Sequence, residues 1–277
     1  MTLRVISAIF AVPFLLGVAY LGDPAYGAFI CLACGYAAFE VRSLLRAGGH
    51  APMDFALFAT AVLLPLDAWW HPDSPSLGAN GLSLGADSTL LIGLIVVVSL
   101  TALLFRSTSE RSLVGWALSI GFALYVGGLM QFYFPLRRLP TDAPFQGFWV
   151  MALLGLSWVC DSSAFFVGRA FGRTRLAPSI SPKKSVEGAV AGLISAALFG
   201  PILGLIFGVS PVLMAGYGLA IAAATIVGDL VESLLKRQTG AKDSGVLIPG
   251  HGGLLDRMDS LLFCAPVAVL YLRAFSG

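Results

Sequence analysis

The sequence predicts an all-α integral membrane protein, a polytopic bundle of about nine transmembrane helices whose N-terminus is cytoplasmic. Hydrophobic residues make up 57% of its 277 residues, and the mean hydropathy is +0.87. Only 12% of the residues are charged, about half of the roughly 25% that soluble domains carry. This composition excludes an ordinary soluble domain, and the net charge of +2 is too small to indicate a nucleic-acid partner.

The apolar residues fall into nine runs, most of them close to the ~20 residues that a transmembrane helix needs. The first run follows Arg4, as in a signal peptide, but no small-residue cleavage site comes after it. We therefore expect it to be retained as a membrane helix. The predicted spans are 5–21, 25–41, 54–70, 89–105, 113–134, 147–168, 188–208, 211–235 and 258–275.

Lysines and arginines in the connecting loops predict the orientation, because such residues concentrate on the cytoplasmic side. With the N-terminus inside, the loops that carry them face the cytoplasm: 42–53, 106–112, 169–187 and 236–257. The external loops carry none, except that 135–146 contains Arg137 and Arg138. The two most highly charged loops, 169–187 and 236–257, are therefore expected at the cytoplasmic face.

The segment 228–260, between two apolar runs, holds five acidic residues, four lysines or arginines and a histidine. A charge at the bilayer centre costs at least ~2.5–3.5 kcal/mol, so charges gathered at the membrane edge indicate a functional site. Residues at i, i+3, i+4 and i+7 share one face of a helix. On this face two carboxylates precede a cation, as expected of a metal site that opens toward an anion: Asp229, Glu232, Ser233 and Lys236.

Gly240 is predicted to end this helix, and a polar loop follows it. Paired glycines let backbone N–H groups approach a phosphate closely, and the next helix then opens with two carboxylates at i and i+3. The loop and the helix start contribute Lys242, Asp243, Ser244, His251, Gly252, Gly253, Asp256 and Asp259.

Two acidic residues interrupt apolar runs elsewhere. Asp161, next to two serines, lies inside a predicted span, and such a carboxylate is a functional candidate by default. A structural hydrogen-bonded pair is the alternative. Glu40 follows a long apolar run, and we expect it either at a solvated helix end or buried with a partner.

Loop 169–187 is the second charged segment. A positive-inside anchor explains some of its cations. It does not explain the turn-forming S-P-K-K-S at 181–185, which precedes Glu187 at a predicted helix start, where free N–H groups and the helix dipole favour phosphate. The cations are Arg169, Arg173, Arg175, Lys183 and Lys184.

Taken in order, these motifs resemble the signature of the phosphatidate cytidylyltransferases, also called CDP-diacylglycerol synthases. One matching region runs from Trp158 to Gly188, with two departures: Phe165 stands where the family has Tyr, and Ser185 where it has Thr. The first 150 residues match only as hydrophobic helices. The other region reads Ser233-x-x-Lys236-Arg237, Lys242-Asp243-Ser244-Gly245, Ile248-Pro249-Gly250-His251-Gly252-Gly253 and Leu255-Asp256-Arg257-x-Asp259.

The resemblance implies an enzyme of phospholipid biosynthesis that joins phosphatidic acid to CTP, giving CDP-diacylglycerol and pyrophosphate. It implies a bacterial inner-membrane protein whose active site faces the cytoplasm. CTP, phosphatidic acid and membrane lipids are the expected partners, and no nucleic-acid partner is expected. Whether the protein forms a homodimer is left open. We expect residues 1–146 to form an N-terminal transmembrane scaffold and 147–277 the catalytic region, with the loops 169–187 and 236–257.

The chemistry of the residues suggests a role for each. Mg²⁺ prefers oxygen ligands, so Asp229 and Asp256 are the leading metal ligands, with Glu232 and Asp259 as further or outer ligands and a second cation left open. Asp161 and Glu187 are further candidates. His251 is expected to donate to a phosphate, orient the glycine loop or act as a general acid. Six cations are expected to neutralise phosphates: Lys183, Lys184, Lys236, Arg237, Lys242 and Arg257. Asp243 is expected to be catalytic. The residues expected to bind the nucleotide are Ser233, Ser244, Gly252 and Gly253.

Two alternatives remain open. The CDP-alcohol phosphotransferases also use aspartates on membrane helices, and Gly252-x(3)-Asp256 imitates part of their motif, but the preceding D-G-x-x-A-R is absent. A secondary transporter could place Asp161 and Asp229 on an ion path, although the charges cluster near one face and no inverted repeat is found. The sequence specifies neither acyl-chain preference nor CTP over dCTP, nor the residues that read cytosine.

Overall fold

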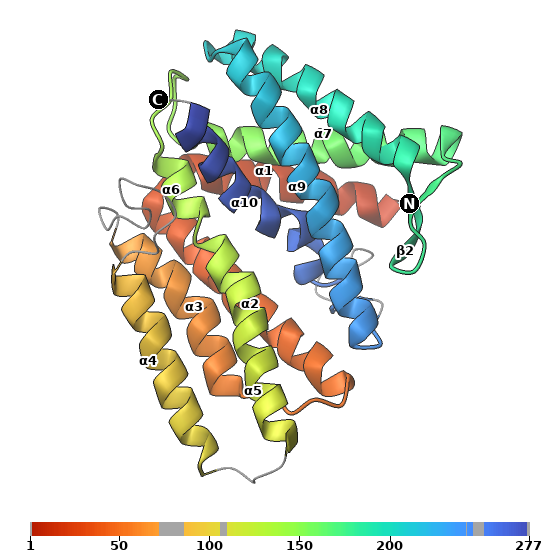
Figure 1. Ribbon diagram of the computed structural model, residues 1–277. Helices are drawn as coiled ribbons and strands as arrows, with labels where there is room; N and C mark the ends of the chain where they lie inside the picture. The colour runs from red at the N-terminus through yellow and green to blue at the C-terminus, as the bar shows by residue number, and fades with distance from the viewer. Residues whose placement is uncertain (1, 72–85, 106–109, 242, 246–251, 276–277) are drawn as a thin grey trace. The chain divides into compact units, whose positions relative to one another are not determined.

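The computed structural model describes residues 2–71, 86–105, 110–241, 243–245 and 252–275 (Figure 1). Most of these residues are helical. The helices are α1 (Thr2–Leu21), α2 (Asp23–Ala47), α3 (Asp54–Trp70), α4 (Ala86–Leu103), α5 (Glu110–Ala123), the π-helical turn η1 (Leu124–Gly128), α6 (Tyr133–Arg138), α7 (Phe148–Phe171), α8 (Val186–Phe207), α9 (Pro211–Gln238) and α10 (Leu255–Phe275).

Each of the nine predicted apolar runs coincides with helical structure, with α5, η1 and α6 together covering the fifth. Within the described residues, six segments are long and apolar enough to cross a membrane: Asp23–Ala47, Ser112–Arg138, Phe148–Phe171, Val186–Phe207, Pro211–Gln238 and Leu255–Phe275. Shorter apolar stretches, Ala11–Leu21 and Ser88–Leu103, lie in α1 and α4. The protein is therefore a helical membrane protein.

The chain divides into two compact units. The first comprises Met1–Pro135 and Gln238–Asp256, and the second Leu136–Arg237 and Arg257–Gly277. In the first unit, α3 packs against α2, α4, α5 and η1. The contacts are close because small residues face one another; for example, a Cβ on Gly127 would collide with the Ala61 backbone.

In the second unit, α7 and α8 pack along each other (Figure 1). Small residues at four-residue spacing let two membrane helices approach closely. The buried face of α8 has this pattern, with Gly188, Gly192, Ala196, Gly200 and Gly204. Its exposed positions are apolar, among them Val190, Ile194, Leu198 and Ile202, which suits a helix in contact with lipid.

Residues 181–185, predicted as a turn, instead form a strand. β2 (Ser181–Ser185) pairs antiparallel with β1 (Arg175–Ala177), and the turn lies between them. Pro182 is tolerated because each strand of a two-stranded sheet has an unpaired edge where its missing N–H is not needed. Ser185 then caps α8 by accepting a hydrogen bond from the Gly188 N–H at 3.2 Å, and Glu187 lies in the first turn, as expected.

Candidate active site

The predicted polar face of α9 is present. Ser233 Oγ donates to Asp229 Oδ1 at 3.4 Å, one turn earlier on the helix. Lys236 Nζ forms a 2.7 Å ion pair with Glu232 Oε2, and Glu232 is only 1% exposed. The buried carboxylate thus neutralises Lys236 in this state, so a phosphate that binds Lys236 must compete with Glu232.

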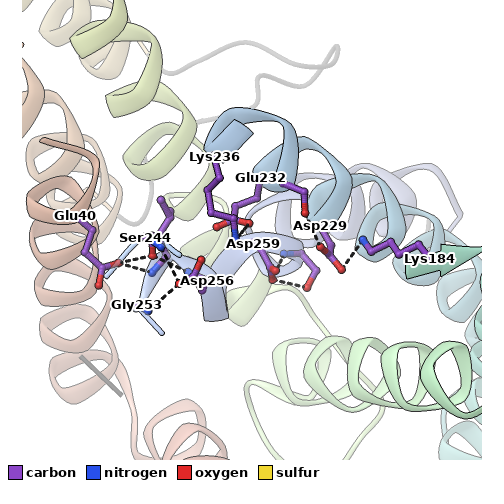
Figure 2. A network of polar contacts seen from close by, with 12 residues as sticks. Glu40, Lys184, Asp229, Glu232, Lys236, Ser244, Gly253, Asp256 and Asp259 are labelled. Atoms are coloured by element: carbon purple, nitrogen blue, oxygen red, sulfur yellow. Dashed lines mark hydrogen bonds and ion pairs between the residues drawn. The ribbon is translucent and has the colours of Figure 1, made fainter. Parts of the chain in front are cut away.

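Asp229 also contacts the hairpin, since Lys184 Nζ on β2 forms a 2.5 Å ion pair with Asp229 Oδ2 (Figure 2). Asp161 on α7 interacts electrostatically with Asp229 and with Asp259 on α10, as well as with Lys184 and Arg257. Three carboxylates from three helices of the second unit therefore gather near two cations. We call Asp161, Asp229 and Asp259 the acidic centre.

Close packing of α9 against α10 forms the acidic centre. A Cβ built on Gly228 would lie 2.9 Å from the Asp259 carbonyl oxygen and 2.9 Å from Ser260 Cα. Only glycine fits this approach, and it directly precedes Asp229. Asp259 is itself held in place, because its Oδ1 accepts hydrogen bonds from the Ser260 N–H at 2.6 Å and from Ser260 Oγ at 3.0 Å.

The donor chemistry of the acidic centre suits a hard divalent cation, which prefers carboxylate oxygens. Among the described residues, however, no group of three or more His, Cys, Asp or Glu side chains is already arranged to hold a metal ion. Asp229 and Asp256 belong to different units. The shared ion cluster predicted for them therefore stays a prediction.

Asp256 organises the loop that precedes α10. It is 5% exposed, and its Oδ2 accepts hydrogen bonds from the Ser244 N–H at 2.9 Å and from the Gly253 N–H at 2.8 Å. The Asp256 N–H in turn donates to Ser244 Oγ at 3.3 Å. The Gly253 N–H, predicted to approach a phosphate, is therefore occupied by a carboxylate in this state.

Glu40 is the residue of this loop network whose role the sequence left undecided. It is 3% exposed on α2 and accepts hydrogen bonds from the Leu254 N–H at 2.9 Å, the Leu255 N–H at 2.7 Å and Ser244 Oγ at 3.2 Å (Figure 2). Of the two expectations for Glu40, burial with a partner is confirmed, and its signal was a carboxylate at the end of an apolar run, which needs a partner. The sequence could not identify that partner, over 200 residues away.

The remaining predicted site residues divide into four groups. Lys242 and His251 lie outside the described residues. The two carboxylate oxygens of Glu187 accept a hydrogen bond from the Thr174 N–H, at 3.0 Å and 3.2 Å. Glu187 therefore stabilises the start of the β1–β2 hairpin. The side chains of four further residues are exposed: Lys183, Arg237, Asp243 and Arg257. Gly252 has a left-handed φ of +83°, as its predicted turn requires.

Comparisons with known proteins agree with these motifs. The profile described as "Cytidylyltransferase family" matches residues 2–275. A phosphatidate cytidylyltransferase of Synechocystis is 31% identical over 303 residues, which cover 98% of this chain and 96% of that protein.

Other relatives align over shorter regions. The phosphatidate cytidylyltransferase of Thermotoga maritima is 36% identical over 161 residues, covering 56% of this chain and 58% of the relative. That of Haemophilus influenzae is 43% identical over 134 residues, 46% of each chain. The chain thus aligns with about half the length of these two relatives and with nearly all of the Synechocystis protein.

Proposed function

The chain belongs to the cytidylyltransferase family, and from this premise we propose that it is a phosphatidate cytidylyltransferase acting in phospholipid biosynthesis. It transfers the cytidylyl group of CTP to phosphatidic acid. The family match over residues 2–275 carries the proposal, and the relative that aligns with 98% of the chain supports it.

The reaction needs little acid–base chemistry from the protein. A phosphate oxygen of phosphatidic acid attacks the α-phosphorus of CTP, and the bond from that phosphorus to the bridging oxygen of pyrophosphate breaks. The attacking phosphate monoester is already ionised at neutral pH, so no general base is required. The main barrier is the approach of two polyanions, so positioning and electrostatic stabilisation dominate.

Asp229 and Asp256 would hold Mg²⁺, with Glu232 and Asp259 as further or outer ligands. When bound, the ion would supply positive charge to the triphosphate and to the departing pyrophosphate. Asp161 joins this set because it is close enough to Asp229 and Asp259 to interact with them electrostatically. A second cation is left open.

The cations of this chain have separate parts in binding. Lys184, now paired with Asp229, and Arg257, close to Asp161, lie beside the acidic centre and bind phosphate oxygens there. Arginine suits bidentate contacts with phosphate, whereas lysine acts as a point charge. The exposed Lys183 and Arg237 attract CTP from solution.

The proposed setting is the bacterial inner membrane, with about nine spans, a cytoplasmic N-terminus and the site at the cytoplasmic face. The loop charges support this orientation, and the relatives named above are bacterial. In this arrangement the headgroup of phosphatidic acid reaches the site from the bilayer, while CTP arrives from the cytoplasm.

A direct assay tests the function. Purified protein in lipid micelles is incubated with labelled CTP, phosphatidic acid and Mg²⁺, and CDP-diacylglycerol and pyrophosphate are measured. Equal amounts of both products are expected. Folded protein that forms neither product contradicts the proposal, and product formation only from CDP-diacylglycerol and an alcohol would favour a CDP-alcohol phosphotransferase.

A further inference from the structure

The first turn of α10 is capped by a side chain of the preceding loop and by one from α2, far away in the sequence. The first N–H groups of a helix have no partner within the helix and must find one elsewhere. Here the Leu254 and Leu255 N–H groups donate to Glu40 Oε1 and Oε2, and the Asp256 N–H donates to Ser244 Oγ. All three groups are therefore satisfied by Glu40 and Ser244.

The Glu40 carboxylate is itself almost fully enclosed. Burying a charge is unfavourable unless hydrogen bonds replace the lost water, and charge-assisted bonds to backbone N–H groups are among the stronger kinds. Glu40 receives two such bonds and a third from the Ser244 hydroxyl. Its position at the positive end of α10 adds the favourable field of the helix dipole.

Gly245 and Gly253 lie so close to the Glu40 carboxylate that a larger residue at either position would collide with it. A Cβ built on Gly245 would lie 2.5 Å from Glu40 Oε1 and 3.0 Å from its carboxyl carbon. A Cβ on Gly253 would lie 2.5 Å from Glu40 Oε1 and would also collide with Ser244 Oγ. Gly245, and Gly253 of the predicted phosphate-binding pair, are thus required to be glycine by the carboxylate of Glu40 on α2.

Ser244 links this contact to a predicted metal ligand. Its hydroxyl donates to Glu40, its Oγ accepts from the Asp256 N–H, and its own N–H donates to Asp256 Oδ2. The orientation of the Asp256 carboxylate therefore depends on Ser244, and that of Ser244 depends on Glu40. All of these residues belong to the first unit.

We propose that Glu40 is a positioning residue of the active site, which fixes Ser244 and the first turn of α10 so that Asp256 faces its ligand. The proposal rests on the function proposed above. It gives the N-terminal helices, which the sequence suggested only as a scaffold, a direct part in forming the site. Glu40 itself touches no substrate and acts through Ser244 and the backbone.

Variants at Glu40 separate its geometry from its charge. Glu40→Gln keeps the volume but places an amide donor against a backbone N–H, and Glu40→Asp keeps the charge but shortens the reach. If Glu40 positions the loop, both variants should lower kcat about 10- to 100-fold, as small misplacements of catalytic groups do. The KM for phosphatidic acid should change by less than about twofold in both.

A second measurement needs no turnover. Backbone hydrogen exchange of the peptide 252–256, which contains the Leu254 and Leu255 amides, should be faster in Glu40→Gln than in the wild type, while exchange in α3 should not change. Asp67→Asn is the matched control, because Asp67 is also a hydrogen-bonded carboxylate of the first unit, less buried than Glu40 and bonded to Ser88 at 2.7 Å. It should leave both kcat and the exchange of 252–256 unchanged.

The two measurements distinguish failure of the inference from failure of the function. Wild-type protein with protected amides but no turnover would refute the proposed function and leave the Glu40 contact in place. Normal kcat or normal exchange in Glu40→Gln would refute the positioning role. If Glu40→Gln does not fold, Glu40→Asp replaces it, and wild-type exchange at 252–256 in that variant would equally refute the role.

Discussion

Lys184 on β2 and Asp229 on α9 form an ion pair between two segments that the sequence identified separately as charged. The pair brings the basic hairpin to the acidic centre within the second unit. Under the proposed function, Lys184 would bind a phosphate instead once the proposed metal ion neutralised Asp229. The contact therefore suggests an exchange of partners when substrate binds.

Asp229→Asn should reduce CDP-diacylglycerol formation by about 100- to 1,000-fold. The substitution removes the carboxylate to which both the proposed Mg²⁺ and Lys184 bind, and the loss of one well-placed electrostatic group costs about 10²–10³ in kcat. Asp256→Asn should be equally damaging. Initial rates with saturating CTP measure both effects.

The matched control for these variants is Asp54→Asn. Asp54 also forms ion pairs, with Arg42 and Arg46 at 2.9 Å each, but it is partly exposed at the start of α3. Surface ion pairs contribute only ~0–1 kcal/mol to stability, so this variant should keep near-normal activity. Near-normal rates in Asp229→Asn or Asp256→Asn would refute the metal assignment.

Lys184→Gln should raise the KM for CTP by about tenfold, because a charge-assisted contact to phosphate is lost. Lys184→Arg keeps the charge and should recover part of the affinity. Lys183→Gln gives the comparison, since Lys183 is exposed and a smaller effect is expected. Equal KM values for all three variants and the wild type would exclude a binding role for Lys184.

Local features of the site were predictable from the sequence, because they depend on spacing along one helix. The face of Asp229, Glu232, Ser233 and Lys236 follows from the 3.6-residue period, and Gly240 has the positive φ, +70°, of a helix-ending glycine. The apolar runs likewise located the helices, because a membrane span requires continuous hydrophobic residues.

Features that depend on packing were not predictable. The contact of Glu40 with Ser244 joins residues 204 positions apart, and nothing in either local pattern specifies the other. The sequence does not predict the β1–β2 hairpin, because its strands are short and Pro182 in the second strand is typical of a turn. The sequence does not identify the role of Gly228, because this glycine allows the backbone of α10 to pack closely against α9. Only the packed structure shows that contact.

Gly228→Ala should destabilise the protein by about 1–3 kcal/mol, the usual cost of overpacking a close contact. The added Cβ would meet backbone atoms of Asp259 and Ser260, which cannot rotate away. A lower thermal midpoint in detergent measures the effect. Gly155→Ala on α7 is the control, because a Cβ there has open space and the alanine favours the helix by roughly 0.5–1 kcal/mol; equal midpoints for the two variants would contradict the predicted close packing.

Removal of divalent cations should abolish turnover, and Mg²⁺ should restore it. The physical reason is the acidic centre, where Asp161, Asp229 and Asp259 interact as like charges and a divalent cation would relieve their repulsion. A stability measurement gives an independent readout, because a ligand that binds only the folded state stabilises it by about 2.7 kcal/mol at a hundred times its Kd. Mg²⁺ should therefore raise the thermal midpoint of the wild type, and this rise should be absent in Asp229→Asn. Full activity in the presence of excess chelator, or an equal Mg²⁺-dependent rise in Asp229→Asn, would rule out a metal ion held by this carboxylate.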